Sequence, residues 1–258
     1  MLVLLSPSKT MASDAPSVQF EPSQPVFLQR AELLMSTLKK MGIGEIEALM
    51  KVSRSIAEDV QERCSKWSVP FTEENAMPAA YGFKGAVYTG LDTRSWTTED
   101  MEFAQGHLRI LSGLYGLLGP KDYMQPYRLE MGLKWPNTSE NKNLYSFWGS
   151  ELQLQIDQQA QGLVVDLASQ EYSKAAQLKS INQRVITPVF KDLVKGEYKA
   201  LMAYAKQARG AMAKFIIQNQ IINPEEMKGF EGMGYQWDAL LSEGDTWLFT
   251  RDKNSIAS

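Results

Sequence analysis

The fold class follows from two short stretches, residues 1–10 (MLVLLSPSKT) and residues 162–169 (GLVVDLAS). Each contains a short apolar run and then a loop that carries hydroxyl groups. Apolar runs of this length, bounded by turn residues, are typical of buried strands in a parallel sheet. Loops that follow such strands meet at one edge of an open α/β sheet, where ligands bind. The two stretches therefore predict an α/β protein with a site beyond its strand ends.

The rest of the chain alternates between helical spacing of apolar residues and short strand-like segments. The spacing predicts helices over residues 27–40, 45–51, 53 or 55 to 67, 97 or 98 to about 114, 148–160 and 208–219. It predicts further strands over residues 86–89, 185–193 and 198–205. We therefore expect a mixed α+β fold within the α/β class, with a mainly helical first third and no internal repeat.

Length and composition indicate an ordinary globular protein. The 258 residues, 44% hydrophobic and 22% charged, suffice for one buried core, so we expect one domain over residues 1–258. The apolar run at residues 1–5 is too short for a signal peptide or a membrane span. Cys64 and His107 are the only cysteine and histidine, which excludes an internal disulfide and a Cys/His metal cluster. We expect a cytoplasmic protein with no stable metal, no cofactor and no membrane association.

Charge is distributed unevenly along the chain. The formal net charge of −3 and the isoelectric point near 5.4 argue against a surface coated in positive charge for nucleic acid. Residues 184–214 nevertheless carry seven basic and two acidic side chains, whereas residues 225–252 carry seven acidic and two basic ones. The pattern fits a local basic surface, and it also fits scattered solvated charges.

Both polar loops carry the groups that bind an anion. Residues 6–10 contain Lys9 and residues 169–174 contain Lys174, each beside hydroxyl groups. Phosphate needs such donors together with a positive charge, although the glycine spacing of a P-loop or dinucleotide fold is missing. Lysines after strands are commonly solvated, so a shared anion site and two solvated lysines both remain open.

Lys206 and Arg209 stand at the expected start of a helix. The helix dipole disfavours a cation there by about 0.3 to 1 kcal/mol. A bound anion would reverse that sign, and arginine offers a bidentate fork for phosphate or carboxylate. The alternative is that both side chains extend into water.

His107 has two open roles. It could act as a general base near neutral pH or form a hydrogen bond in the interior. The sequence places no nucleophile beside it, which favours the interior role.

Residues 41–44 (MGIG) match the turn of a helix-hairpin-helix. In that motif, backbone amides at a helix N-terminus bind a DNA phosphate. Glu45 and Glu47 follow directly and would repel a phosphate. The short pattern is therefore a weak indication of DNA binding.

Six longer motifs are far more specific than any short glycine pattern. They are residues 6–10 (SPSKT), 83–91 (FKGAVYTGL), 107–116 (HLRILSGLYG), 124–132 (MQPYRLEMG), 166–172 (DLASQEY) and 206–212 (KQARGAM). Taken in this order, they resemble the YaaA peroxide stress family, also called DUF328 or UPF0246. The resemblance covers the chain from Met1 to about Phe249.

The resemblance implies a bacterial cytosolic protein that protects against hydrogen peroxide by lowering the pool of unincorporated iron. It implies an unusual single-domain fold, the family's "cantaloupe" fold, in which helices enclose a sheet beside a positively charged cleft. Carried over by motif, the residues expected in that cleft are Lys9, Lys84, Arg109, Arg128, Lys174, Lys206 and Arg209. Four of them, Lys9, Arg128, Lys174 and Arg209, are expected to surround one cavity.

The resemblance also implies a helix-hairpin-helix that binds duplex or branched DNA. Its place in this chain would be residues 31–67. The residues of the hairpin would be Gly42, Gly44, Lys51 and Arg54.

Two functions remain in competition. The first is DNA binding, in which lysine and arginine hold phosphates without reading sequence. The second is an enzyme acting on a nucleotide or another phosphorylated small molecule, with Lys9 and Arg128 as anion clamps. Its candidate catalytic residues are Glu130, Glu171, Tyr172 and His107. Any effect on iron is expected to be indirect, because one histidine and one cysteine make no dedicated site.

Overall fold

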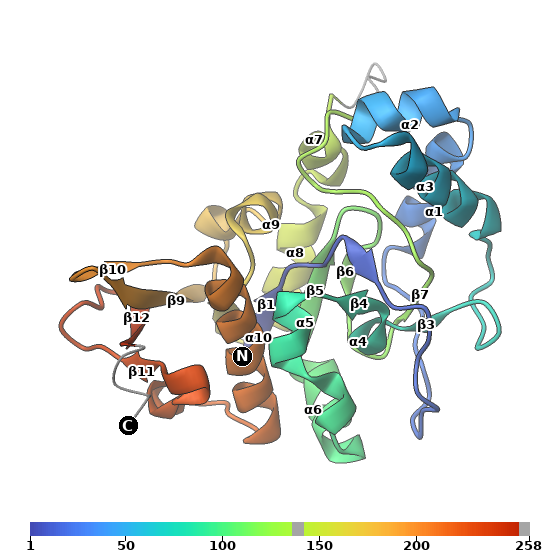
Figure 1. Cartoon of the computed structure of the whole chain (residues 1–258). Helices are drawn as coiled ribbons and strands as arrows, with labels where there is room; N and C mark the ends of the chain where they lie inside the picture. Colours follow the sequence, from blue (N-terminus) through green and yellow to red (C-terminus); the bar gives the residue numbers. More distant parts are fainter. Residues whose placement is uncertain (136–141, 253–258) are drawn as a thin grey trace.

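A central sheet forms the middle layer of the molecule and joins both ends of the described chain (Figure 1). The computed structural model describes residues 1–135 and 142–252. In spatial order the strands are β11 (Gln236–Trp237), β12 (Thr246–Arg251), β9 (Arg184–Val194), β8 (Leu163–Asp166), β1 (Leu2–Leu5), β5 (Leu108–Ser112) and β6 (Gly116–Leu118), with β10 (Glu197–Lys199) paired to β9. The five strands from β12 to β5 run parallel, and β6, β10 and β11 are antiparallel to their neighbours.

Helices cover both faces of this sheet. In Figure 1, α5 (Ala86–Leu91), α6 (Thr98–His107) and α10 (Met202–Gln218) lie in front of it, and α8 (Glu151–Gln159) and α9 (Gln170–Ala175) lie behind. Every residue of β1 and β8 is buried, as expected for parallel strands with helices on both sides. The predicted α/β class, with a sheet enclosed by helices, is confirmed.

A helical group lies at one end of the molecule and the strands β9 to β12 lie at the other (Figure 1). The group consists of α1 (Leu28–Leu38), α2 (Ile43–Met50) and α3 (Arg54–Lys66), which confirms the three predicted helices to within about two residues at each end. None of the helices in the described residues is both long and apolar enough to span a membrane. The predicted domain end at residue 258 lies outside the described residues.

Short elements connect these parts. They are β2 (Thr10–Met11) paired with β4 (Phe83–Lys84), β3 (Met77–Pro78) paired with β7 (Tyr123–Met124), α4 (Ala79–Gly82), α7 (Leu144–Trp148), and the 3-10 turns η1 (Thr93–Ser95), η2 (Leu178–Ser180), η3 (Pro224–Gly229) and η4 (Gly232–Gly234).

The predicted strand over residues 86–89 is wrong, because these residues form the helix α5. The β-branched Val87 and Thr89 favour a strand locally, but tertiary packing decides against it. α5 packs against α10 at two glycines: a Cβ on Gly90 would lie 2.0 Å from Gln207 O, and one on Gly210 would lie 1.8 Å from Val87 O. The two backbones therefore touch, and only glycine permits this contact.

The predicted helix over residues 97–114 ends earlier than expected. α6 begins after Thr97, whose side chain accepts a hydrogen bond from Asp100 N, and it ends at His107. Leu108 to Ser112 form β5, which lies between β1 and β6. A short buried apolar run cannot be assigned to helix or strand by its spacing alone, and no glycine or proline separates the two elements here.

The strand predicted over residues 198–205 is also wrong in extent. The strand over 185–193 is confirmed as part of β9, but β10 covers only Glu197–Lys199. The following helix, α10, begins at Met202, six residues before the predicted start at 208. Met202, Ala203 and Tyr204, which were predicted to lie in a strand, instead form the first turn of α10. Met202 and Ala203 line the pocket described below.

Candidate functional site

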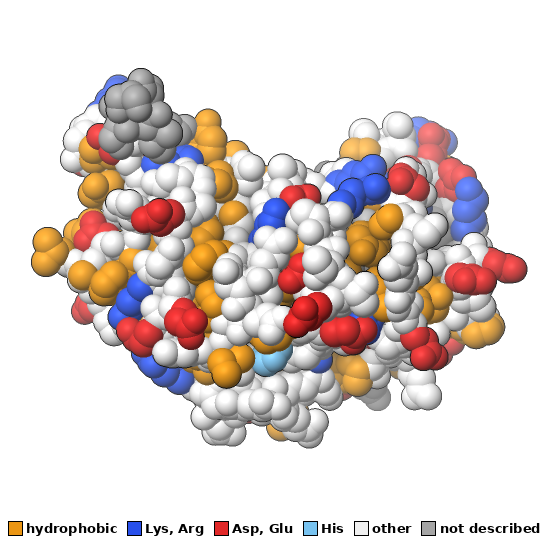
Figure 2. Space-filling view, turned by 90° about the horizontal axis from the view of Figure 1, so that it is seen from below, with side chains coloured by type: hydrophobic (Ala, Val, Ile, Leu, Met, Phe, Trp, Pro, Cys, Tyr) orange, Lys and Arg blue, Asp and Glu red, His pale blue; other side chains and the backbone are white. Residues whose placement is uncertain are grey.

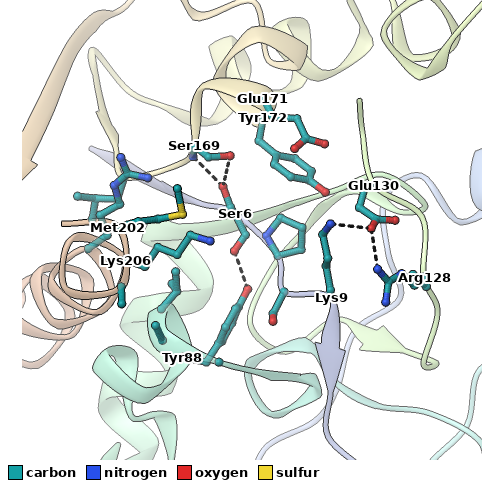
Figure 3. Close-up of a pocket in the computed structure, with 18 of the residues that line it drawn as sticks. Ser6, Lys9, Tyr88, Arg128, Glu130, Ser169, Glu171, Tyr172, Met202 and Lys206 are labelled. Atoms are coloured by element: carbon teal, nitrogen blue, oxygen red, sulfur yellow. Dashed lines mark hydrogen bonds and ion pairs between the residues drawn. The ribbon is translucent and has the colours of Figure 1, made fainter. Parts of the chain in front are cut away.

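The carboxyl ends of β1 and β8 lie side by side, because these parallel strands pair directly. The loops that follow them are hydrogen-bonded to each other: Ser169 N donates to Ser6 Oγ at 2.7 Å, and Ser6 Oγ donates to Ser169 Oγ at 3.2 Å. The Tyr88 hydroxyl of α5 donates to Ser6 O at 3.0 Å. Two polar loops and a helix thus meet at one point (Figure 3).

A pocket of about 590 Å³ opens at this point, within the usual volume range of small-molecule sites. Its charged lining comes from separate segments of the chain and consists of Lys9, Arg128, Glu130, Glu171, Lys206 and Arg209. Of the four residues expected around one cavity, Lys9, Arg128 and Arg209 line this pocket, and Lys174 does not.

One side of the pocket carries an ion cluster around Glu130. Its Oε1 accepts from Lys9 Nζ at 3.0 Å and from Arg128 Nη2 at 3.2 Å. The Lys9 side chain is 66% exposed, whereas those of Glu130 and Arg128 are 13% and 18% exposed. Glu130 Oε2 and Arg128 Nε are buried without a hydrogen-bond partner in the described residues. Such unsatisfied buried groups are uncommon in proteins and are often found at functional sites.

The other side of the pocket carries Lys206 and Arg209 of α10 (Figure 3 labels Lys206). Within the described chain, no carboxylate lies within ion-pair distance of either side chain. Burial lowers the pKa of Arg209, while the nearby Asp166 carboxylate raises it. Because an arginine remains charged under all ordinary conditions, this side of the pocket carries two cations, and among the described residues the nearby Asp166 acts on Arg209 without forming an ion pair with it.

The prediction that Lys206 and Arg209 stand at the start of a helix is wrong. α10 begins at Met202, so Lys206 lies in its second turn and Arg209 in its third. The dipole acts mainly on the first turn and has little effect at these positions. The positive side of the pocket therefore depends on the two side chains and not on the helix terminus.

Glu171 and Tyr172 lie on α9 at the back of the same pocket. Glu171 Oε1 accepts a hydrogen bond from Gly132 N at 2.7 Å, and no partner for Oε2 lies in the described residues. Burial raises the pKa of Tyr172 well above its usual value, so its hydroxyl is neutral at physiological pH. With respect to the described residues, the pair thus offers one unoccupied carboxylate oxygen and one neutral hydroxyl.

Two of the expected cleft cations lie elsewhere. Lys84 lines a neighbouring pocket of about 330 Å³, which shares Gly85 and Tyr88 with the first. Arg109 lies on β5, where it donates to Gln159 Oε1 at 2.8 Å and to two backbone oxygens at 2.7 Å. Lys84 is adjacent to the site, whereas the geometry of Arg109 is that of a structural residue.

Lys174 and His107 also lie outside the pocket lining. The Lys174 ammonium lies 4.7 Å from the centre of the Tyr145 ring. His107 Nδ1 lies 2.8 Å from Met1 O, and its ring stacks on Phe103 at 4.1 Å. Met1 precedes β1 and the pocket follows it, so His107 lies at the opposite end of that strand.

Several residues that line the pocket were not predicted from the sequence. Tyr88, Tyr127 and Met202 line the pocket, but Tyr88 and Met202 stand in segments that were assigned to strands. Tyr127 lies next to Arg128 in a quoted motif, and this proximity was the one signal available. Apolar and aromatic residues attract little attention as site residues unless the fold is known.

The comparison with known families agrees with the quoted motifs. A family model described as "Peroxide stress protein YaaA" matches residues 1–241. The chain belongs to this family. All the pocket residues fall within the matched region.

Relatives of this YaaA family member align with it over nearly its full length. A UPF0246 protein of Colwellia psychrerythraea is 45% identical over 98% of this chain and 100% of its own length. UPF0246 proteins of Aliivibrio fischeri and Saccharophagus degradans are 45% and 42% identical over 99% and 97% of this chain, and 100% and 99% of their own.

The region 31–67, where we expected a helix-hairpin-helix, consists of α1, α2, α3 and their turns. The amide of Gly42, at the start of α2, donates to Glu45 Oε2 at 2.8 Å. Arg54 pairs with Glu58 at 3.1 Å, and Lys51 ends α2 in a left-handed conformation with a φ of 52°. The amide that would bind a phosphate is thus already bonded to a carboxylate, and none of these residues lines the pocket.

Proposed function

We propose that this peroxide stress family member is a cytoplasmic protein that binds the phosphates of duplex or branched DNA at the pocket without reading sequence. The observation that supports the proposal is the meeting of Lys9, Arg128, Lys206 and Arg209 at one concave site. Contacts to phosphate position a protein on DNA, and their strength depends on the number of cations. Among the described residues, neither Lys206 nor Arg209 forms an ion pair that a phosphate would have to break, although Asp166 lies near Arg209.

The local character of this charge matters, because the protein as a whole is acidic. The formal net charge is −3, and on the one face drawn in Figure 2, seen from below, basic and acidic side chains are intermixed. Binding is therefore expected to rest on a few phosphate contacts at the pocket and to weaken steeply with salt.

The experiment that tests DNA binding is a titration of labelled duplexes at several salt concentrations. We expect Lys206→Ala combined with Arg209→Ala to weaken the binding of all DNA sequences alike. The slope of log affinity against log salt concentration should fall by about two, one for each lost contact. The control is Lys179→Ala, because Lys179 is exposed and does not line the pocket. An unchanged slope in the double variant would exclude this site for DNA.

We further propose that the protection against peroxide includes a lower pool of unincorporated iron, reached indirectly. No group of three or more His, Cys, Asp or Glu residues able to hold a metal occurs in the part of the chain that the structure describes. Thiolate and imidazole ligands are limited to Cys64 and His107 in the sequence.

Purified protein is therefore expected to contain no stoichiometric iron. Elemental analysis after chelator treatment measures this directly. About one tightly bound iron per chain would contradict an indirect route.

A second candidate function is an enzyme that acts on a nucleotide or another phosphorylated small molecule. The acids Glu130 and Glu171 among the cations favour it, since phosphate binding alone needs no carboxylates. In this role Lys9 and Arg128 hold the anion, Glu130 or Glu171 acts as acid or base, and Tyr172 assists. The position of His107 beyond the other end of β1 gives no support to a role in catalysis.

A further inference from the structure

The pocket has two chemically different ends, and this division points to a particular ligand. In Figure 3, Met202 and Lys206 lie on one side, Lys9, Glu130 and Arg128 lie on the other, and Ser6 and Tyr172 lie between them. The charges of the second group are partly neutralised by the Glu130 ion pairs. The α10 side is therefore the stronger anion site.

The α10 end suits a phosphate group. Lys206 and Arg209 offer two cations, and arginine can donate to two phosphate oxygens at once. Ser6 donates its hydroxyl to Ser169 Oγ, so the hydrogen of the Ser169 hydroxyl is free to donate to a ligand. Inorganic phosphate alone would leave most of the 590 Å³ unfilled.

The α10 end of the pocket also has an apolar wall that is exposed to solvent. Met202 lines the pocket and is 74% exposed as a residue, and Val87 and Ala203 also line the pocket. Apolar surface gains free energy when a ligand covers it, and a methionine thioether makes favourable contacts with aromatic rings. The wall therefore fits a flat ring carried close to the phosphate.

A further group, Glu171, suits hydroxyl groups. Its Oε1 is held by Gly132 N, which fixes the side chain, and Oε2 is an acceptor without a partner in the part of the chain that the structure describes. A carboxylate is a suitable acceptor for ribose hydroxyls, as the acidic residue that bonds the ribose in dinucleotide-binding folds illustrates. A deoxyribose lacks the 2′-hydroxyl and would lose part of this interaction.

We propose that the pocket binds a ribonucleoside phosphate, with its phosphate at Lys206, Arg209 and Ser169, its base against Met202, and its ribose hydroxyls at Glu171. The inference rests on the second candidate function and names its ligand class. It also distinguishes a free ribonucleotide from a nucleotide extruded from DNA, which carries the same phosphate but no 2′-hydroxyl.

Calorimetric titration of the full chain with four probes tests the inference. The probes are adenosine 5′-monophosphate, its 2′-deoxy analogue, ribose 5-phosphate and inorganic phosphate. We expect the ribonucleotide to bind most tightly, and the deoxy analogue and ribose 5-phosphate each to bind about tenfold more weakly, the equivalent of one lost hydrogen bond or one lost apolar contact. Lys206→Ala should weaken all four, and Lys179→Ala none.

Glu171→Gln is the most informative variant. The glutamine oxygen can still accept from Gly132 N, while its amide group replaces the acceptor Oε2 by a donor, so folding is preserved and the charge-assisted hydrogen bond to the ribose hydroxyls is replaced by a weaker neutral one. We expect the tenfold preference for the ribonucleotide over its deoxy analogue to fall to about threefold or less. Met202→Gln should lower the affinity for the nucleotide towards the affinity for ribose 5-phosphate. The affinity for ribose 5-phosphate should stay unchanged.

Equal affinities for the ribonucleotide and its deoxy analogue would overturn the proposal, and so would the absence of binding by any probe. The DNA titrations described above, run on the same samples, separate the two ideas. DNA binding that depends on Lys206 without any nucleotide binding leaves the DNA function intact and contradicts this inference. Nucleotide binding without DNA binding would support this inference and contradict the proposed DNA function.

Discussion

Gly210→Ala should lower the free energy of unfolding by roughly 3 kcal/mol, at the upper end of the usual cost of overpacking. A Cβ at this position would lie 1.8 Å from Val87 O and 2.7 Å from Leu91 N, and both are backbone atoms that no rotamer change can move. The variant can therefore fold only if α10 moves away from α5. Because α10 carries Lys206 and Arg209, the same displacement should weaken phosphate binding at the pocket.

Urea unfolding measures this effect through the midpoint of the transition. Gly106→Ala is the matched control, because Gly106 lies in α6 and a Cβ there would meet nothing within 4 Å. Alanine favours a helix over glycine by about 0.5 to 1 kcal/mol, so the control should be neutral or slightly more stable. Equal midpoints for Gly210→Ala and the unaltered protein would show that the contact is not tight.

The part of the fold predicted best is the pair of strands that opens each half of the site. Each of β1 and β8 is a continuous apolar run followed by hydroxyl residues, and burial on both faces leaves that signal in the sequence. β5 is an equally buried strand, but it follows α6 directly after His107. Without a turn residue between them, helix and strand merged into one apparent helix.

α5 shows the opposite limit, since its own residues give a misleading signal. Val87 and Thr89 favour a strand, yet α5 is held by α10, which lies more than a hundred residues later in the chain. The two glycines at the crossing appear in the sequence only as single residues of different motifs. Their contact could be found only by placing both helices in three dimensions.

The site was predictable to the extent that its charges lie within distinctive motifs. Lys9, Arg128 and Arg209 were expected around one cavity, and all three line it. The expectation failed for Lys174, whose ammonium lies 4.7 Å from the centre of the Tyr145 ring and does not line the pocket. The pairing of Glu130 with both Lys9 and Arg128 depends on side-chain geometry that no spacing encodes.

Asp192→Asn should cost about 3 to 5 kcal/mol of unfolding free energy, because it leaves Arg251 charged and unpaired in the interior. Asp192 Oδ1 accepts from Arg251 Nε at 2.8 Å and from Nη2 at 2.5 Å, and its Oδ2 accepts from the Tyr235 hydroxyl at 2.9 Å. Both side chains of the ion pair are buried. The pair joins β9 to β12 and thus fixes the end of the sheet that lies next to α10.

The same variant is expected to affect the pocket, because the Arg251 guanidinium lies 4.9 Å from the centre of the Tyr204 ring in the first turn of α10. Tyr204 stands between Met202 and Lys206 in the chain. A less firmly held Arg251 should therefore leave Met202 and Lys206 less firmly positioned in the pocket. The control is Asp245→Asn, which breaks the exposed pair with Arg184 on the same strand β9. Exposed pairs contribute about 0 to 1 kcal/mol, so the control should unfold almost as the unaltered protein does. If both variants had the same urea midpoint, the buried pair would have no special part in holding α10.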